Sequence, residues 1–276
     1  TEPGGARLLV IAADAGMGKS TLAARLTRCL AERSKIERIL GDSAKNRRVD
    51  VVRGTVIGQT TEIFDSTSCL RKLCAQSGLP YPNGQGANDR AVRLIRDKFL
   101  GRRVLIVIDN LESVQDVDEL MPRLAAMVSD DLRVIVTTRS TKGLSSFSPR
   151  QVLVELQPLR DYSDISKFIR WHVDHFQSSH PRLVNLLPEL DNKHNLRRLI
   201  DRTGGVPLLV QLVVSKIAVN SWDQLNLLPD CVGDELLRYL YEERWHELVQ
   251  AGDPGLTARA ILAYVTQEQE KGKKVT

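Results

Sequence analysis

A glycine-containing run near the start of the chain has the residue types and spacing of a phosphate-binding loop. Residues 13–21 read Ala-Asp-Ala-Gly-Met-Gly-Lys-Ser-Thr, after an apolar run at 8–12 and before a helical pattern. Glycines allow backbone N–H groups to turn toward phosphate oxygens, and the following helix contributes the positive end of its dipole. This order of strand, glycine loop, Lys-Ser and helix predicts a site for a nucleoside triphosphate.

The residues of this loop have separate expected roles. Lys19, a candidate catalytic residue, can reach the β- and γ-phosphates, and the hydroxyl of Ser20 can be a ligand of Mg²⁺. Ala13 stands where the general pattern has its first glycine, and alanine can form the same turn when its φ is negative. The loop residues expected to bind the nucleotide are Ala15, Gly16, Met17, Gly18, Lys19, Ser20 and Thr21.

A carboxylate follows a second apolar run, at residues 104–108. This run leads directly into Asp109. In an open α/β sheet, ligands bind at the carboxyl edge of the strands. We therefore expect Asp109 to be a catalytic residue that binds Mg²⁺ opposite Ser20, either directly or through water.

The residue after Asp109 bears on the rate of hydrolysis. Fast ATPases of related type have an acid at this position that activates water, whereas the amide of Asn110 cannot accept a proton. Glu112 either replaces this acid or is a solvated loop residue. The sequence therefore predicts a slow, Mg²⁺-dependent ATPase.

Two further motifs lie later in the chain. An apolar run at residues 133–137 leads into Thr138 and Arg139. Arg139 is expected to bind the γ-phosphate as a third catalytic residue, the alternative being a surface arginine in a loop. Residues 203–209, Thr-Gly-Gly-Val-Pro-Leu-Leu, show by themselves only the end of one helix, a turn and the start of another.

The spacing of apolar residues predicts an α/β domain followed by helices. Continuous apolar runs are typical of parallel strands that are covered on both faces, and here they alternate with helical patterns. Strands are expected at 7–12, 49–57, 104–108, 133–137 and 151–156, and helices at 19–33, 66–77, 89–100 and 118–129. Loops are expected at 41–48 and 78–88. Beyond a boundary near 156–161, helices are expected at 162–176, 190–203, 207–220, 234–249 and 257–266.

Composition excludes several classes of protein. The 276 residues are 42% hydrophobic and 26% charged, which is typical of a soluble globular protein, and no apolar stretch is long enough for a membrane span. The four cysteines have no metal-binding spacing, so we expect reduced core thiols and a cytoplasmic location. No secretory signal begins the chain, and both ends resemble cuts made in a longer protein.

Histidines and basic residues suggest two other sites, and we favour neither. His172 and His175 lie three residues apart, but no third metal ligand is evident, so a packing role is preferred. Basic pairs are scattered along the chain without interleaved aromatic residues, and the net charge is only +5. Nucleic acid is therefore an unlikely partner of this segment.

The motifs in this order resemble the NB-ARC type of signal-transduction ATPase, within the STAND class of P-loop proteins. The phosphate loop is followed by Leu22-Ala23 as in that family, and Asp109-Asn110-Leu111-Glu112 is similar to the bacterial form of its second motif. Thr137-Thr138-Arg139 resembles the family's sensor strand, and Leu156-Gln157-Pro158-Leu159 resembles the exit from its last core strand. Gly205-Val206-Pro207-Leu208 is similar to its Gly-x-Pro element, whose proline packs on adenine. The related NACHT branch has a more acidic second motif.

This resemblance implies a molecular switch controlled by ATP and ADP. It implies a P-loop domain with a five-stranded, mainly parallel sheet over residues 1–158, a helical lid domain over 159–233 and the start of a winged-helix domain over 234–276. ADP would hold these parts closed, and ATP would favour an open form that oligomerises within a longer protein with flanking sensor and effector domains. The family's winged-helix histidine has no counterpart here. The alternative is an AAA-type ATPase that acts on nucleic acid.

Overall fold

The structure is a computed structural model that describes most of the first 222 residues. The described residues are 6–33, 36–44, 47–50, 55–58, 63, 65–139, 141, 150–178, 181–220 and 222, with backbone only at 47–50, 55–58, 216, 219 and 220. The predicted helices at 234–249 and 257–266, the predicted winged-helix segment 234–276 and Cys231 lie outside these residues.

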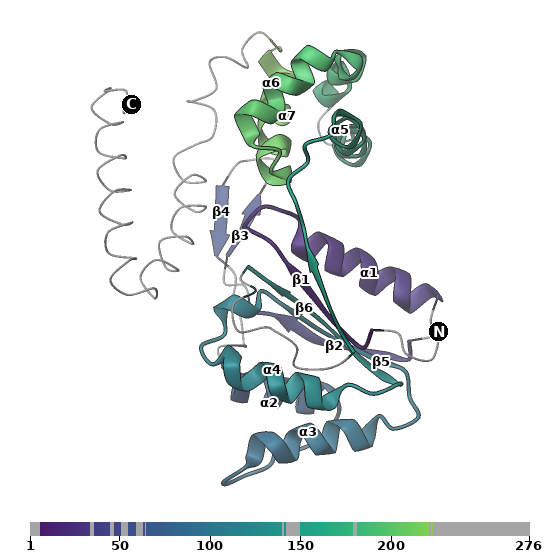
Figure 1. The fold of residues 1–276 in the computed structure, drawn as a ribbon, viewed down its shortest axis with the longest axis vertical. Helices are drawn as coiled ribbons and strands as arrows, with labels where there is room; N and C mark the ends of the chain where they lie inside the picture. The colour runs from purple at the N-terminus through teal and green to yellow at the C-terminus, as the bar shows by residue number, and fades with distance from the viewer. Residues whose placement is uncertain are drawn as a thin grey trace, which may run out of the picture.

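A five-stranded parallel sheet is the centre of the first part of the chain (Figure 1). Its strands lie in the order β2-β5-β6-β1-β7. Their bounds are β1 Leu8–Ala12, β2 Arg38–Ser43, β5 Val104–Asp109, β6 Leu132–Thr138 and β7 Gln151–Glu155. The apolar runs of β5 and β6 are buried almost throughout, as expected for central parallel strands. The predicted fold class, an α/β P-loop fold with a five-stranded sheet, is confirmed.

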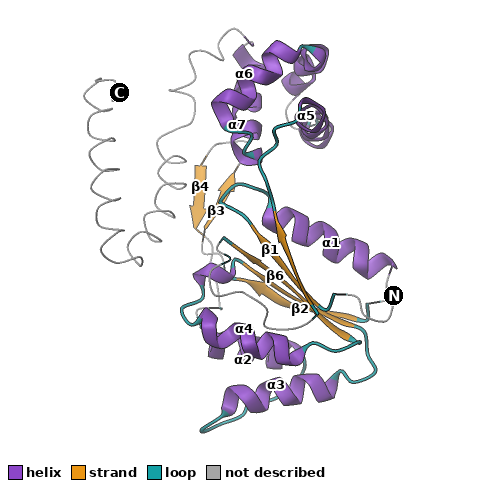
Figure 2. Cartoon of the chain, viewed as in Figure 1, coloured by secondary structure: helices purple, strands orange, loops and turns teal. Residues whose placement is uncertain are grey.

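Helices cover both faces of this sheet (Figures 1 and 2). The helix α1, Lys19–Arg33, packs on one face against a small cluster that includes Ile11, Leu105 and Ile135. On the other face, α2, α3 and α4 enclose a larger core that includes Leu70, Ile106 and Leu124. These helices span Ser66–Gln76, Ala87–Lys98 and Val117–Met127. The sheet therefore lies between two helical layers, and this packing fixes the position of its carboxyl edge.

A separate helical unit follows the sheet. It contains α5 (Tyr162–Phe176), the 3₁₀ segment η2 (Pro181–Asp191), α6 (Lys193–Thr203) and α7 (Pro207–Asn220). These elements share their own apolar core, which includes Ile169, Leu199 and Val213. Figure 1 shows this unit at one end of the molecule, beyond the edge of the sheet at which α1 begins. The domain boundaries at 158 and 233 stay predictions, because the chain beyond residue 222 is not described.

Two predictions about the second strand are wrong. The predicted loop at 41–48 overlaps β2, and the predicted strand at 49–57 is instead part of a separate antiparallel pair, β3 (Arg47–Asp50) with β4 (Thr55–Gly58). The strand β2 has few apolar residues because it lies at the edge of the sheet, where Ile39 is half-exposed. Gly41, at a φ of 116°, lies against the next strand, where a Cβ would be 1.9 Å from the Val107 carbonyl oxygen.

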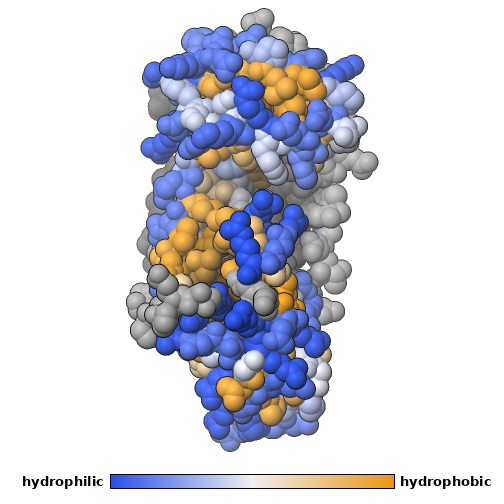
Figure 3. Space-filling view, turned by 90° about the vertical axis from the view of Figure 1, so that its right-hand side faces the viewer, coloured by the Kyte–Doolittle hydropathy of each residue, from blue (hydrophilic) through white to orange (hydrophobic). Residues whose placement is uncertain are grey.

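Two other elements differ from the patterns that predicted them. The single helix expected at 190–203 is α6 preceded by η2, because the Asn192 side chain caps α6 by accepting from His194 N and Asn195 N. The strand expected at 151–156 is β7, which ends at Glu155 and lies exposed at the edge of the sheet. Its Val152, Leu153 and Val154 are at least one-third exposed, and Figure 3 shows apolar side chains at the level of the sheet.

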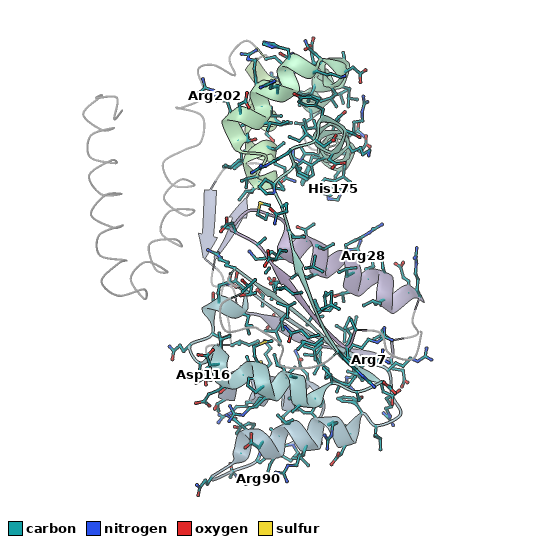
Figure 4. All side chains as sticks on the ribbon, viewed as in Figure 1. Arg7, Arg28, Arg90, Asp116, His175 and Arg202 are labelled. Atoms are coloured by element: carbon teal, nitrogen blue, oxygen red, sulfur yellow. The ribbon has the colours of Figure 1, made fainter. Side chains whose placement is uncertain are left out.

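The predicted packing roles of two thiols and of His172 agree with the described residues, whereas Cys29 is only partly buried. Cys69 and Cys74 are buried free thiols, and burial raises the pKa of Cys69 to about 12. His172 is buried against Phe176, with its Nε2 3.3 Å from Ser215 Oγ, and His175 stacks on Trp171. Figure 4 shows His175 on the helical unit. None of the helices in the described residues has the length and apolar character needed to cross a bilayer.

Replacing the N-cap of α2 is expected to destabilise the fold with a defined pH dependence. Asp65 accepts from Ser68 N, and this hydrogen bond holds the pKa of Asp65 below its ordinary value of 3.8. Asp65→Ala should lower the free energy of unfolding by about 1 kcal/mol at pH 7, measured by urea denaturation. A lowered carboxyl pKa stabilises the fold above the unfolded value, so this contribution should fall as the pH drops from 5 to 3.

The matched control for this prediction is Asp65→Asn. The amide oxygen can still cap α2, so most of the stability at pH 7 should remain. The variant has no titrating group at residue 65, so the stability difference from the wild type should shrink as Asp65 is protonated. A difference that is constant between pH 5 and pH 3 would contradict the assignment of the cap.

Candidate functional site

The phosphate loop connects β1 to α1 with the conformation that its glycines allow. Gly16 and Gly18 have φ values of 77° and 86°, which residues with a Cβ rarely adopt. The ammonium of Lys19 is buried beneath the loop and donates to Ala13 O at 2.7 Å and Asp14 O at 3.1 Å. Its charge is therefore fixed at the loop before any nucleotide binds.

The predicted pair of Ser20 and Asp109 is in direct contact. Ser20 Oγ lies 2.7 Å from Asp109 Oδ1 and 2.9 Å from Oδ2. Two further hydroxyls converge on the same carboxylate, because Thr137 donates to Oδ1 at 2.5 Å and Ser43 donates to Oδ2 at 3.0 Å. The carboxylate is thus held from three elements: α1, β6 and β2.

These oxygens fit the requirements of Mg²⁺. The ion prefers hard oxygen ligands at about 2.1 Å in an octahedron, so two adjacent ligands lie about 3 Å apart. The 2.7 and 2.9 Å separations between Ser20 Oγ and the two Asp109 oxygens are close to this value. Ser20 and Asp109 would hold the ion, which supplies charge to neutralise the phosphates during transfer.

Asn110 turns the chain sharply after β5. It is a residue with a left-handed backbone conformation (φ 67°, ψ 49°), which asparagine tolerates better than most residues. Its backbone N–H donates to Thr137 Oγ1 at 2.8 Å, and its side chain donates to Ser113 Oγ. This turn places the short 3₁₀ segment η1, Leu111–Ser113, directly beyond the Asp109 carboxylate.

Glu112, on η1, forms an ion pair with Arg139. Arg139 Nε lies 2.7 Å from Glu112 Oε1, and the two side chains are only 9% and 18% exposed. Burial raises the pKa of Glu112, while the charges of Arg139 and Lys19 oppose this effect. The alternative in which Glu112 is a solvated loop residue is therefore wrong. The alternative in which Arg139 is a surface arginine is wrong as well.

The helical unit contacts the phosphate loop through the turn before α7. Leu208 N donates to Gly16 O at 3.1 Å, and a Cβ on Gly16 would lie 3.0 Å from Leu208 Cβ. Gly205, with a φ of 71°, packs on the backbone of Leu159, whose N–H donates to Gly205 O at 2.9 Å. Pro207 is the first residue of α7 and stands next to Leu208 in this contact. The turn at residues 205–208 thus connects the helical unit to the phosphate loop.

The structure brings most of the predicted site residues to one edge of the sheet. The residues from Ala15 to Gly18 form the loop, and Lys19, Ser20 and Thr21 form the first turn of α1. Asp109 contacts Ser20, and Pro207 lies beside a residue that contacts Gly16. Arg139 follows the adjacent strand β6. Their roles toward a nucleotide stay predictions.

The contacts of three residues in this arrangement were not predicted from the sequence. Thr137 and Ser43 hold Asp109, and Glu112 pairs with Arg139. A signal existed for Thr137, which is a polar residue at the end of a buried strand. Ser43 gave no signal because β2 was not predicted.

A family model described as an AAA domain matches residues 2–145, which is more than half of the chain. The chain belongs to the AAA-domain family. This AAA domain is an AAA-family P-loop ATPase, and members of the family bind nucleotide and typically Mg²⁺. A comparison with curated proteins gave no match.

Several solved structures resemble this chain at low sequence identity. Cdc6p of Pyrobaculum aerophilum is 12% identical with a TM-score of 0.49, over 79% of this chain and 56% of that protein. The Orc1 protein of Aeropyrum pernix, solved in complex with DNA, is 14% identical with a TM-score of 0.47, over 100% of this chain and 69% of that one. A Pyrococcus horikoshii STAND protein with a tetratricopeptide repeat sensor is 16% identical with a TM-score of 0.37, over 91% and 44%. The chain therefore spans little more than half of the first of these proteins and less than half of the third.

Proposed function

We propose that this AAA domain is a nucleotide-dependent switch that binds ATP and ADP, hydrolyses ATP slowly and belongs to the NB-ARC-type STAND ATPases. The observation that carries the proposal is the hydrogen bond from Leu208 N to Gly16 O. It links the helical unit to the loop that would bind the phosphates. A ligand at the loop therefore acts directly on the position of the lid.

Arg139 makes the affinity for ATP differ from the affinity for ADP. Only ATP has a γ-phosphate for this guanidinium, and a ligand shifts an equilibrium only by its differential affinity for the two states. One charge-assisted contact contributes about 1.5–3 kcal/mol, or roughly a 10- to 150-fold preference. A shift from 1:99 to 99:1 needs about 10⁴-fold, so a full switch requires further contacts, which we assign to Pro207 at the adenine and to flanking domains.

Slow hydrolysis follows from the residue after Asp109. Fast ATPases of related type have an acid there, whereas the amide of Asn110 cannot accept a proton. Loss of general-base catalysis costs about 10²- to 10⁴-fold in rate. In the longer protein, ATP hydrolysis would then time an open state that oligomerises and signals from the cytoplasm.

A turnover measurement tests this proposal. With Mg²⁺ and saturating ATP, the purified chain should hydrolyse ATP below about 0.1 per second, which is some 100-fold below a typical enzyme. Rapid steady-state hydrolysis would contradict the timer. Stimulation of hydrolysis by DNA would instead support an ATPase that acts on nucleic acid.

A further inference from the structure

The pairing of Glu112 with Arg139 has the geometry of a restraint on the arginine. The two groups lie 2.7 Å apart, and their side chains are largely removed from solvent. Both carboxylate oxygens of Glu112 are buried, and neither accepts a hydrogen bond of normal geometry from the described residues. A buried carboxylate is costly without a compensating charge, so the pair depends on the cation beside it.

The two partners differ in how firmly the fold holds them. Glu112 lies on a short segment that is fixed between the buried residue Leu111 and the left-handed residue Asn110. Arg139 directly follows β6, which is the strand next to β5 in the sheet. The long arginine side chain can therefore change partner, whereas the backbone that carries Glu112 is held in place.

A γ-phosphate at the loop must compete with Glu112 for this guanidinium. The charge of Lys19, whose ammonium is held at the phosphate loop, also lowers the pKa of Glu112. When Arg139 turns to the phosphate, Glu112 loses its closest cation inside a buried environment. The free energy of ATP binding therefore includes the cost of separating the ion pair between Glu112 and Arg139, whereas that of ADP binding does not.

We infer that Glu112 is a positioning residue that holds Arg139 in the absence of a γ-phosphate and so sets the ratio of ATP affinity to ADP affinity. This inference rests on the proposed function, because it presumes that Arg139 detects the γ-phosphate. Glu112 acts through Arg139 and needs no contact with the nucleotide. This role accounts for a glutamate two residues after Asn110, whose amide cannot accept a proton.

The test compares the affinities of the variants for ADP and for a non-hydrolysable ATP analogue, by calorimetry with Mg²⁺ on the whole chain. Glu112→Gln keeps the shape of the side chain but removes its charge. It should raise the affinity for the ATP analogue about 10-fold, equal to about 1.4 kcal/mol, and change ADP affinity less than 2-fold. Glu112→Asp keeps the charge and should restore part of the wild-type ratio.

Variants of Arg139 separate this inference from the proposed function. Arg139→Gln should abolish the preference for the ATP analogue, and Glu112→Gln in that background should then leave the affinity ratio unchanged. If Arg139→Gln acts as expected but Glu112→Gln leaves the ratio unchanged, or changes both affinities equally, the inference is overturned and the switch stands. If Arg139→Gln does not alter the ratio, the proposed γ-phosphate sensor fails as well.

Discussion

Lys19→Ala is expected to abolish measurable nucleotide binding. The Lys19 ammonium is buried and already held at the loop by Ala13 O and Asp14 O, so it meets the phosphates with little loss of side-chain entropy. Charge-assisted bonds to the β- and γ-phosphates contribute about 3 kcal/mol together, so the affinity for ATP should fall at least about 100-fold. ADP keeps only the β-phosphate contact, so its affinity should fall at least about 10-fold. Calorimetric titration with each nucleotide in Mg²⁺ measures this loss.

Arg28→Ala is the matched control for this variant. Arg28 is an exposed cation of the same helix, and Figure 4 shows it away from the loop. Removing it takes away the same charge from the chain but should change affinity less than about 2-fold, because an exposed charge is screened by solvent and salt. Unchanged affinity in Lys19→Ala, with its fold verified by thermal melting, would refute the assignment of the phosphate site.

Gly205→Ala is expected to disrupt the turn before α7, through which the helical unit contacts the phosphate loop. A Cβ at this residue would lie 2.1 Å from Leu159 O, and the φ of 71° is itself unfavourable for alanine. Because the clash is with backbone, it cannot be relieved by a side-chain rotation, and the cost should be about 3 kcal/mol. Amide hydrogen exchange should be faster at Leu159, whose N–H donates to Gly205 O, and at Leu208, whose N–H donates to Gly16 O.

The neighbouring Gly204 provides the control. Its φ is 60°, but a Cβ there meets nothing within 4 Å, so Gly204→Ala carries the backbone strain without the clash. We expect a loss of only about 1 kcal/mol in urea denaturation and unchanged exchange at Leu159. The proposed coupling also predicts weaker nucleotide binding in Gly205→Ala. Equal stabilities of the two variants would contradict the packing described for the lid.

The phosphate loop, α1 and the carboxylate at the end of β5 could be predicted from the sequence alone. These features are local, because a strand, a glycine turn and a helix start are encoded within a few adjacent residues. The predicted helices 19–33, 162–176 and 207–220 match α1, α5 and α7 for the same reason: their apolar spacing continues without interruption. Asp109 could be paired with Ser20 in advance because parallel strands end at one edge.

The side chains that contact Asp109 and Glu112 at that edge could be identified only from the tertiary structure. Ser43 reaches Asp109 because β2 lies next to β5, and Arg139 reaches Glu112 because β6 lies on the other side of β5. The order of strands arises from packing across the whole sheet, which no local pattern contains. The edge strand β2 was missed for a related reason, since partial exposure removes the apolar run that marks a buried strand. The chain therefore specified a phosphate site locally, whereas the partner of its candidate sensor arginine depends on strand order.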